Sequence, residues 1–188
     1  MPKRGWLIWL GSTLIIAGTF SLAWYSWTLH EREVAQRFAK KWLDKAIGMH
    51  RSTSSPVRHG DVIGELQIPR LHVSVMVFEG DDSGVLEQGA GHIPGTGYSP
   101  DGGNIGIAAH RDTYFRGLRV IHANDVITLK TPADTTHYVV TETKMVTPFD
   151  VDVLAPAAGR DLTLVTCYPF YYVGSAPERF IVHARKVG

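Results

Sequence analysis

An apolar pattern dominates the first 29 residues of the chain. Lys3 and Arg4 precede a run from Gly5 to Leu29 that contains no charged residue. A helix rises 1.5 Å per residue, so about 20 residues cross the hydrocarbon layer of a bilayer, and this run is long enough. Aromatic side chains cluster near both ends of the run, as they do at the two interfaces of a membrane: Trp6, Trp9, Trp24, Tyr25 and Trp27.

This pattern predicts a single-pass transmembrane signal anchor at residues 6–28. Basic residues before the anchor would keep residues 1–5 in the cytoplasm and place the C-terminal domain on the extracytoplasmic side of the cell membrane. Basic residues also follow the run, which weakens the charge contrast. The alternative is a cleaved signal peptide, with Ser21-Leu22-Ala23 as a poor cleavage site behind a long apolar run. The uncleaved anchor is the favoured interpretation.

Residues 30–50 have apolar positions four apart, which is typical of one face of a helix. Such a helix would extend the anchor, lie on a membrane surface, or pack on the following domain, and a packed or solvated stalk is favoured. The polar stretch 51–56 contains Pro56 and predicts a linker. We therefore expect residues 29–60 to form a helical stalk and linker, and residues 61–188 to form the folded domain.

From residue 60 onward, apolar and polar positions alternate with a period of two, in short runs separated by Gly and Pro. This pattern predicts a mainly β domain, either a barrel or a sandwich, with only short helices. Strands are expected at 64–69, 71–77, 104–110, 125–129, 137–145, 162–167 and 179–185. Short helical turns are expected at 81–87 and 114–121, and loops at 89–103 and 154–156.

Composition narrows the classes of function. Lys and Arg number 19 against 18 Asp and Glu, a net charge of +1, which gives no electrostatic case for nucleic acid binding. The single cysteine rules out an internal disulfide. Nine histidines are present but have no metal-binding spacing, so no metal and no cofactor are expected.

Cys167 is the candidate nucleophile, because it ends the strand pattern Thr163-Leu164-Val165-Thr166 and Pro169 follows soon after. A thiolate attacks only when a neighbouring base or cation activates it. His110 ends the run 104–109 and follows small residues that leave space around it. Arg179 opens the last strand and would supply a donor for an oxyanion. The alternation predicts that these three side chains converge if their strands are neighbours.

Three stretches together resemble the sortases, a family of membrane-anchored cysteine transpeptidases that attach proteins to bacterial cell surfaces. They are the run 103–112 (GNIGIAAHRD), the motif 163–167 (TLVTC) and Arg179 at the start of the last strand. Residues 89–94 and 100–104 also resemble the family's approach to its catalytic histidine. The resemblance covers about residues 60–188, is strongest to class D and extends to class E. It implies an eight-stranded sortase-like β-barrel.

The resemblance also implies roles for individual residues. Cys167 would form a thioacyl intermediate with the threonine carbonyl of an LPxTG-type C-terminal sorting motif. His110 would act as the general acid and base, and Arg179 would hold the carbonyl oxygen. Thr166 and Ala109 are expected near the substrate. His92 is expected to be structural, and Asp112 to cap the following helix.

The same resemblance implies the partners. They are surface proteins that carry a C-terminal sorting signal, an amine acceptor of the cell envelope, and the membrane. Some sortases respond to Ca²⁺, which would need converging carboxylates, and Glu65, Asp81, Asp82 and Glu87 are the candidates here. Two alternatives stay open. One is a non-catalytic β-barrel that binds a partner at the cell envelope with Cys167 buried, and the other is a purely hydrolytic cysteine protease.

Overall fold

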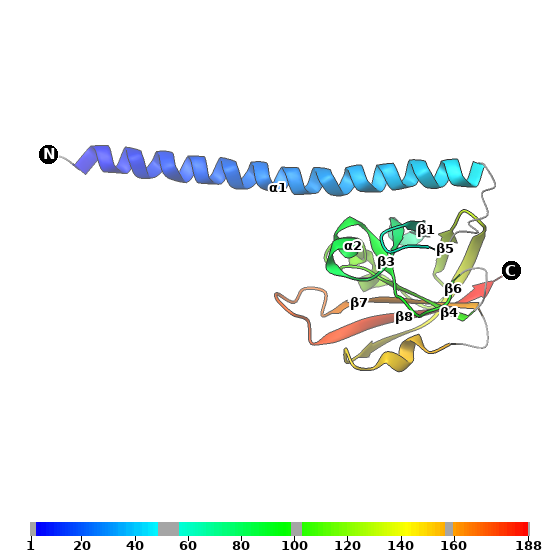
Figure 1. The fold of residues 1–188 in the computed structure, drawn as a ribbon. Helices are drawn as coiled ribbons and strands as arrows, with labels where there is room; N and C mark the ends of the chain where they lie inside the picture. The colour runs from blue at the N-terminus through cyan, green and yellow to red at the C-terminus, as the bar shows by residue number, and fades with distance from the viewer. Residues whose placement is uncertain (1–2, 49–56, 99–102, 157–159, 188) are drawn as a thin grey trace. The chain divides into compact units, whose positions relative to one another are not determined.

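The computed structural model describes residues 3–48, 57–98, 103–156 and 160–187. The expected linker at 51–56 lies outside these residues. Contacts divide the chain into two units, Met1–Ala35 and Gln36–Gly188. A single helix, α1 (Lys3–Gly48), contains the first unit and enters the second (Figure 1).

The first unit is one helical segment with apolar side chains directed outward all around it. Trp6, Trp9 and Phe20 are about 70% exposed, with values of 69%, 75% and 69%. A helix that is apolar on every side normally has an apolar environment. In the portion of the chain that the structure describes, no helix has both the length and the apolar character needed to cross a membrane.

The second part of α1 packs on the folded domain. Ala39 and Leu43 are buried and join a small cluster with Met76, Phe78 and Val85. Lys40 lies 2.9 Å from the carboxylate of Glu65. The helix expected at residues 30–50 is therefore present as the second half of α1. Its buried side packs on the domain, which is one of the three arrangements expected from the sequence. The contact is made by one side of the helix, and Phe38 on another side is 74% exposed.

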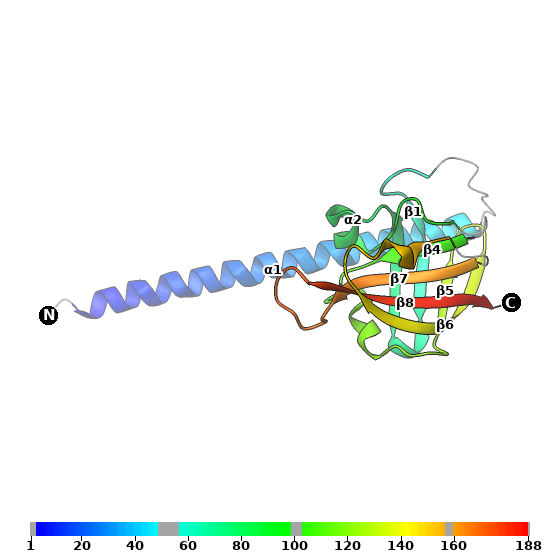
Figure 2. The same cartoon turned by 90° about the horizontal axis from the view of Figure 1, so that it is seen from below.

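Eight strands close into a barrel in the order β1-β2-β3-β4-β7-β8-β6-β5 (Figures 1 and 2). This arrangement confirms the expected eight-stranded barrel. β2–β3 and β4–β7 are parallel pairs, and the other pairs are antiparallel. The strands are β1 (Val62–Ile68), β2 (Val73–Glu79), β3 (Ala90–His92), β4 (Gly103–Ala108), β5 (Val126–Lys130), β6 (Thr135–Val146), β7 (Arg160–Tyr168) and β8 (Glu178–Val187).

The barrel interior takes alternate residues from each strand, as the period of two predicted. Leu66, Ile107, Leu162, Leu164 and Val182 are fully buried in one cluster that fills the interior. The residues between them point outward. This alternation places Cys167 on the outer face of the barrel, where a substrate can reach it.

β3 lies in a segment that the sequence predicted to be loop. It is only three residues long, so it shows no periodic pattern, and it is stabilised by pairing with β2 and β4. Gly91 is required there because a Cβ atom at this position would lie 2.1 Å from the carbonyl oxygen of Gly80. A strand held by such a close backbone approach gives a sequence signal typical of a loop.

Among the described residues of the domain, the short helical segments that follow β1 are η1 (Pro69–Leu71), α2 (Ser83–Gln88), η2 (Arg116–Val120) and η3 (Val151–Leu154). Asp82 caps α2 by accepting a hydrogen bond from the Gly84 amide at 2.9 Å. The expected cap by Asp112 is wrong. The residue that precedes η2 is Phe115, no side chain caps this helix, and Asp112 is exposed.

Candidate active site

Cys167 and Arg179 are direct neighbours across two antiparallel strands. Cys167 is near the end of β7, Arg179 is near the start of β8, and the register pairs them. Side chains at such opposed positions have their Cβ atoms about 4.5–5.5 Å apart. Both residues are half-buried and lie on the outer face of the barrel. The register therefore places the Arg179 and Cys167 side chains next to each other on one face of the sheet.

His110 approaches the same place from the other side of β7. β4 runs parallel to β7, and its last residue, Ala108, pairs with Val165. The Ala109 amide continues the ladder and donates to the Val165 carbonyl at 3.2 Å. His110 follows two residues after the end of β4 and is half-buried. β4, β7 and β8 are adjacent in the barrel, so the segment that carries His110 leaves β4 beside the end of β7 that carries Cys167.

Thr166 and Ala109 point inward beneath this face, and both are buried. The Thr166 hydroxyl donates to the Ala109 carbonyl oxygen at 2.7 Å. This hydrogen bond joins the residue before Cys167 to the residue before His110. Because the hydroxyl is buried and engaged, its observed role is to hold the two strand ends together.

The Arg179 guanidinium is held by the backbone that precedes it. Its Nη1 donates to the carbonyl oxygens of Glu178 at 3.0 Å and Ala176 at 3.3 Å. The contact with Glu178 is made to the backbone carbonyl of that residue and not to its carboxylate. These carbonyls set the direction in which the guanidinium can offer its other N–H groups to a substrate oxygen.

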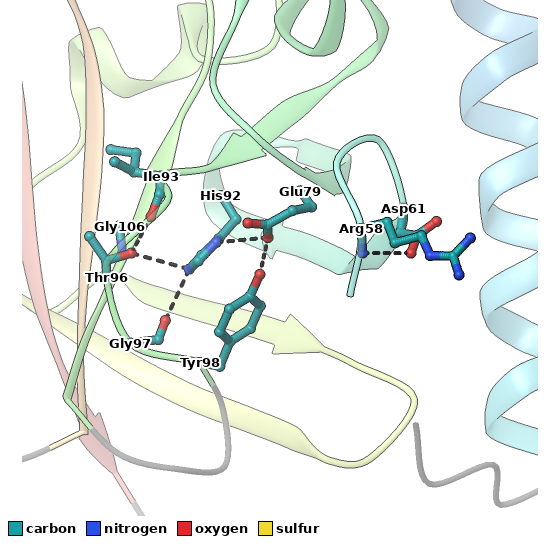
Figure 3. A network of polar contacts seen from close by, with 9 residues as sticks. All are labelled: Arg58, Asp61, Glu79, His92, Ile93, Thr96, Gly97, Tyr98 and Gly106. Atoms are coloured by element: carbon teal, nitrogen blue, oxygen red, sulfur yellow. Dashed lines mark hydrogen bonds and ion pairs between the residues drawn. The ribbon is translucent and has the colours of Figure 1, made fainter. Parts of the chain in front are cut away.

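His92 belongs to a separate buried network, shown in Figure 3. It is 1% exposed, its Nδ1 lies 3.0 Å from a carboxylate oxygen of Glu79, and its Nε2 lies 3.0 Å from the Gly97 carbonyl. The Tyr98 hydroxyl donates to the same Glu79 oxygen. Burial and the Glu79 carboxylate raise the pKa of Tyr98 above its usual value. The network braces β3 and the turn that follows it, which supports the structural role expected for His92.

A polar pocket occupies the other end of the outer face and was missed by the sequence reasoning. Thr163 is fully buried there, donates to Asn104 Oδ1 at 2.8 Å and lies 3.1 Å from His183 Nδ1. Burial lowers the pKa of His183 below its usual value. The pocket has a volume of about 410 Å³ and is lined in part by Glu142, Asp161 and Arg185. Thr163 and Cys167 lie on the same face of β7. The alternation in the sequence could therefore have predicted that Thr163 faces this pocket side of the sheet.

The carboxylates considered for Ca²⁺ do not form a joint site among the described residues. Glu65 is buried beside Lys40 and Ser74. Asp82 caps α2 and contacts His59. No group of three or more His, Cys, Asp or Glu side chains in the described ranges has an arrangement that could hold a metal ion.

Comparison with known proteins decides the family. A sortase domain model matches residues 66–187. The chain belongs to the sortase family. Sortases are cysteine transpeptidases, and this sortase is 34% identical over 129 residues to Sortase D of Bacillus subtilis, covering 68% of this chain and 65% of that protein. It is 31% identical over 196 residues to sortase SrtE1 of Streptomyces coelicolor, covering 94% of this chain and 54% of that protein.

A solved structure extends the likeness to the fold. The sortase D5 transpeptidase of Clostridium perfringens superposes with a TM-score of 0.72 at 26% identity, covering 84% of this chain and 98% of that one. Of the two classes expected from the sequence, class D is therefore favoured. This sortase spans less than two thirds of the length of the two curated relatives.

Proposed function

We propose that this sortase cleaves an LPxTG-type C-terminal sorting motif between its threonine and the next residue and transfers the protein to an amine acceptor of the cell envelope. The observation that carries the proposal is the register of β4, β7 and β8. It places Cys167 directly opposite Arg179, and the strand end before His110 is bonded to β7. A nucleophile, an acid–base group and an oxyanion donor at one strand end are the parts that acyl transfer needs.

The proposed reaction has two halves. The Cys167 thiolate attacks the threonine carbonyl, and the guanidinium of Arg179 stabilises the charge that develops on the carbonyl oxygen. His110 then donates a proton to the leaving amine as the C–N bond breaks, which leaves a thioester on Cys167. In the second half, His110 takes a proton from the incoming amine as the amine attacks the thioester. The C–S bond then breaks, and the Cys167 thiolate and the protonated His110 of the starting state are restored. The half-buried position of Cys167 gives a peptide access to the sulfur.

The test is turnover of a fluorogenic LPxTG-type peptide by the purified full chain, with and without an added amine. We expect Cys167→Ala and His110→Gln to lower kcat/KM by at least about a thousandfold, the scale seen when members of a catalytic group are removed. Arg179→Ala should lower kcat/KM by about a hundredfold or more, because loss of an oxyanion donor has an effect of this size. Arg185→Ala is the matched control, because Arg185 lies on the same face of β8 and is exposed. Undiminished turnover by Cys167→Ala would exclude the proposal.

The amine separates transfer from simple hydrolysis. For a transpeptidase, added amine should divert most of the acyl group into a transfer product without slowing cleavage. For a purely hydrolytic protease, the product remains the free acid at every amine concentration. A non-catalytic binding module would cleave the peptide in neither condition.

We also propose that residues 6–28 anchor the protein in the cell membrane by a single pass, with the N-terminus in the cytoplasm and the domain outside. The support is the uncharged run from Gly5 to Leu29, the basic residues Lys3 and Arg4 before it, and the exposed apolar side chains of this helical segment. Surface proteins with a sorting signal and an amine of the envelope are then the natural partners. Full chain that leaves the membrane fraction on alkaline carbonate washing would contradict the anchor.

A further inference from the structure

The loop between β7 and β8 joins two residues of the proposed active site. It begins after Tyr168, next to Cys167, and ends at Glu178, next to Arg179. Figures 1 and 2 show this loop, in orange, extending beyond the ends of both strands. Its tip is exposed and apolar, with Tyr171 at 75% and Val173 at 95% exposure. The loop therefore lies where a substrate that approaches Cys167 would meet it.

Arg111, which directly follows His110, holds the backbone of this loop. Its Nη2 donates to the carbonyl oxygen of Tyr172 at 2.7 Å and to that of Gly174 at 3.0 Å. Its guanidinium carbon is 6.0 Å from the centre of the Tyr172 ring, at the limit of a cation–π contact. Contacts to carbonyl oxygens fix the path of the chain itself. The end of the histidine segment is thereby tied to the loop that separates Cys167 from Arg179.

The remaining amino group of Arg111 leaves the Nη2 contacts as the ones that hold the loop. Its Nη1 is buried and has no hydrogen-bond partner among the described residues. The two hydrogen bonds to the loop carbonyls therefore come from Nη2 alone.

A second arginine contacts the same loop in a different way. Arg119, from η2, is exposed and donates to the Tyr171 hydroxyl, and its guanidinium carbon lies 5.9 Å from the ring. This contact is made to an exposed side chain at the tip of the loop and not to the loop backbone. Arg119 is therefore the matched control for Arg111.

The far end of the loop determines where the guanidinium of Arg179 lies. Arg179 Nη1 donates to the carbonyls of Ala176 and Glu178, and Ala176 is only two residues beyond Gly174, which Arg111 holds. A shift of the loop backbone therefore shifts these carbonyls and with them Arg179. The contacts form one continuous path from Arg111 through the loop to Arg179.

We propose that Arg111 is a positioning residue for the transfer reaction: it holds the β7–β8 loop so that the Arg179 guanidinium faces the substrate carbonyl at Cys167. This inference rests on the proposed sortase function. An oxyanion donor acts mainly in the transition state, so its misplacement lowers kcat and kcat/KM together and leaves KM nearly unchanged. A residue that only stabilised the fold would instead lower the melting temperature without this kinetic pattern.

The test compares Arg111→Met, Arg111→Lys and Arg119→Met in the full chain with the fluorogenic peptide. We expect Arg111→Met to lower kcat by tenfold to a hundredfold with KM within about twofold, because a small misplacement of a catalytic group has an effect of this size. Arg111→Lys, which can still reach one carbonyl, should recover part of the loss. Arg119→Met should stay within twofold of the wild type.

A double-mutant cycle shows whether Arg111 acts through Arg179. In an Arg179→Ala background, Arg111→Met should change kcat by less than about twofold, because there is no guanidinium left to misplace. An equal loss of activity in both backgrounds would overturn the proposed path. So would an unchanged kcat in Arg111→Met alone.

Hydrogen exchange of the loop amides tests the restraint without any peptide. Amides of residues 170–176 should exchange at least about tenfold faster in Arg111→Met than in the wild type and in Arg119→Met. Unchanged exchange overturns the inference even if the enzyme is an active sortase. If the wild type cleaves no sorting peptide, the proposed function and the catalytic part of the inference fail together, and the exchange result still decides whether Arg111 restrains the loop.

Discussion

The Thr166 hydroxyl donates a 2.7 Å hydrogen bond to the carbonyl oxygen of Ala109, and both residues are buried. Each residue directly precedes a proposed catalytic residue, Cys167 in one strand and His110 in the other segment. β4 and β7 are parallel and far apart in the sequence, so nothing local fixes their ends relative to each other. Together with the β4–β7 ladder, this bond holds the two strand ends together from inside the barrel.

Replacement of Thr166 by Val should therefore damage both stability and activity. The change keeps the shape of the side chain but leaves the buried Ala109 carbonyl without its donor, which costs about 1–3 kcal/mol of unfolding free energy. We also expect at least a tenfold loss in kcat/KM, because the backbone before His110 is released. Denaturant unfolding and peptide cleavage measure the two effects.

Thr166→Ser is the control for this prediction, since it keeps the hydroxyl and removes only a methyl group. It should retain most of the activity. If Thr166→Val were as active as Thr166→Ser, the bond to Ala109 would have no part in placing His110.

Packing of the second half of α1 on the barrel predicts that substitutions at Leu43 and at Phe38 have very different effects on the free energy of unfolding. Leu43 is 1% exposed in the cluster with Met76 and Phe78, so Leu43→Ala should cost about 2–5 kcal/mol of unfolding free energy. Phe38→Ala removes a larger side chain, but Phe38 is 74% exposed, and its loss should stay within about 0.5 kcal/mol. Urea unfolding of the two variants makes the comparison. Equal costs would show that this face of the helix is not packed.

The ion pair between Arg70 and Asp125 makes stability depend on acid pH. Asp125 is buried and accepts hydrogen bonds from the Arg70 guanidinium and from the His122 amide. The Arg70 hydrogen bonds, opposed by burial and helped by the His122 amide, hold the pKa of the Asp125 carboxyl below its ordinary value. A carboxyl with a lowered pKa in the folded state contributes stability that is fully present above its unfolded pKa of about 3.9. That stability is lost as the pH falls through the folded pKa.

The measurement is the unfolding free energy of the wild type and of Asp125→Asn at several pH values from 7 to 2. The difference between the two proteins should be constant above about pH 5 and shrink below about pH 4. The same comparison in an Arg70→Met background should show a much weaker dependence on pH. A difference that grows as the pH falls would have the wrong sign for this ion pair.

Much of the barrel could be predicted from the sequence, and so could the strand faces that carry the proposed site residues, because these signals are local. Alternation along 104–110, 162–167 and 179–185 assigned His110, Cys167 and Arg179 to faces of their own strands. The β4–β7 and β7–β8 pairings then merged these faces into one. The alternation needs no knowledge of distant residues, whereas the β4–β7 pairing joins residues that are 57 positions apart in the sequence.

The features that the sequence did not predict depend on contacts with residues that no sequence pattern identifies. β3 is three residues long and is defined by hydrogen bonds to β2 and β4. Arg111 contacts backbone carbonyls about 60 residues away, and any residue type supplies a carbonyl. Asp112 has the side chain of a helix cap, but the helix after it starts too late to be capped. In each case the missing information was the three-dimensional neighbour.

The most direct test of the central claim is the mass of Cys167 during turnover. The full chain is mixed with an LPxTG-type peptide, quenched in acid within the first turnover, and digested for mass spectrometry. We predict a thioester adduct on the fragment that contains Cys167, with the mass of the peptide up to its threonine, and its disappearance when an amine is added. A chain that cleaves the peptide with no adduct on Cys167, or an adduct that an amine cannot remove, would contradict the account.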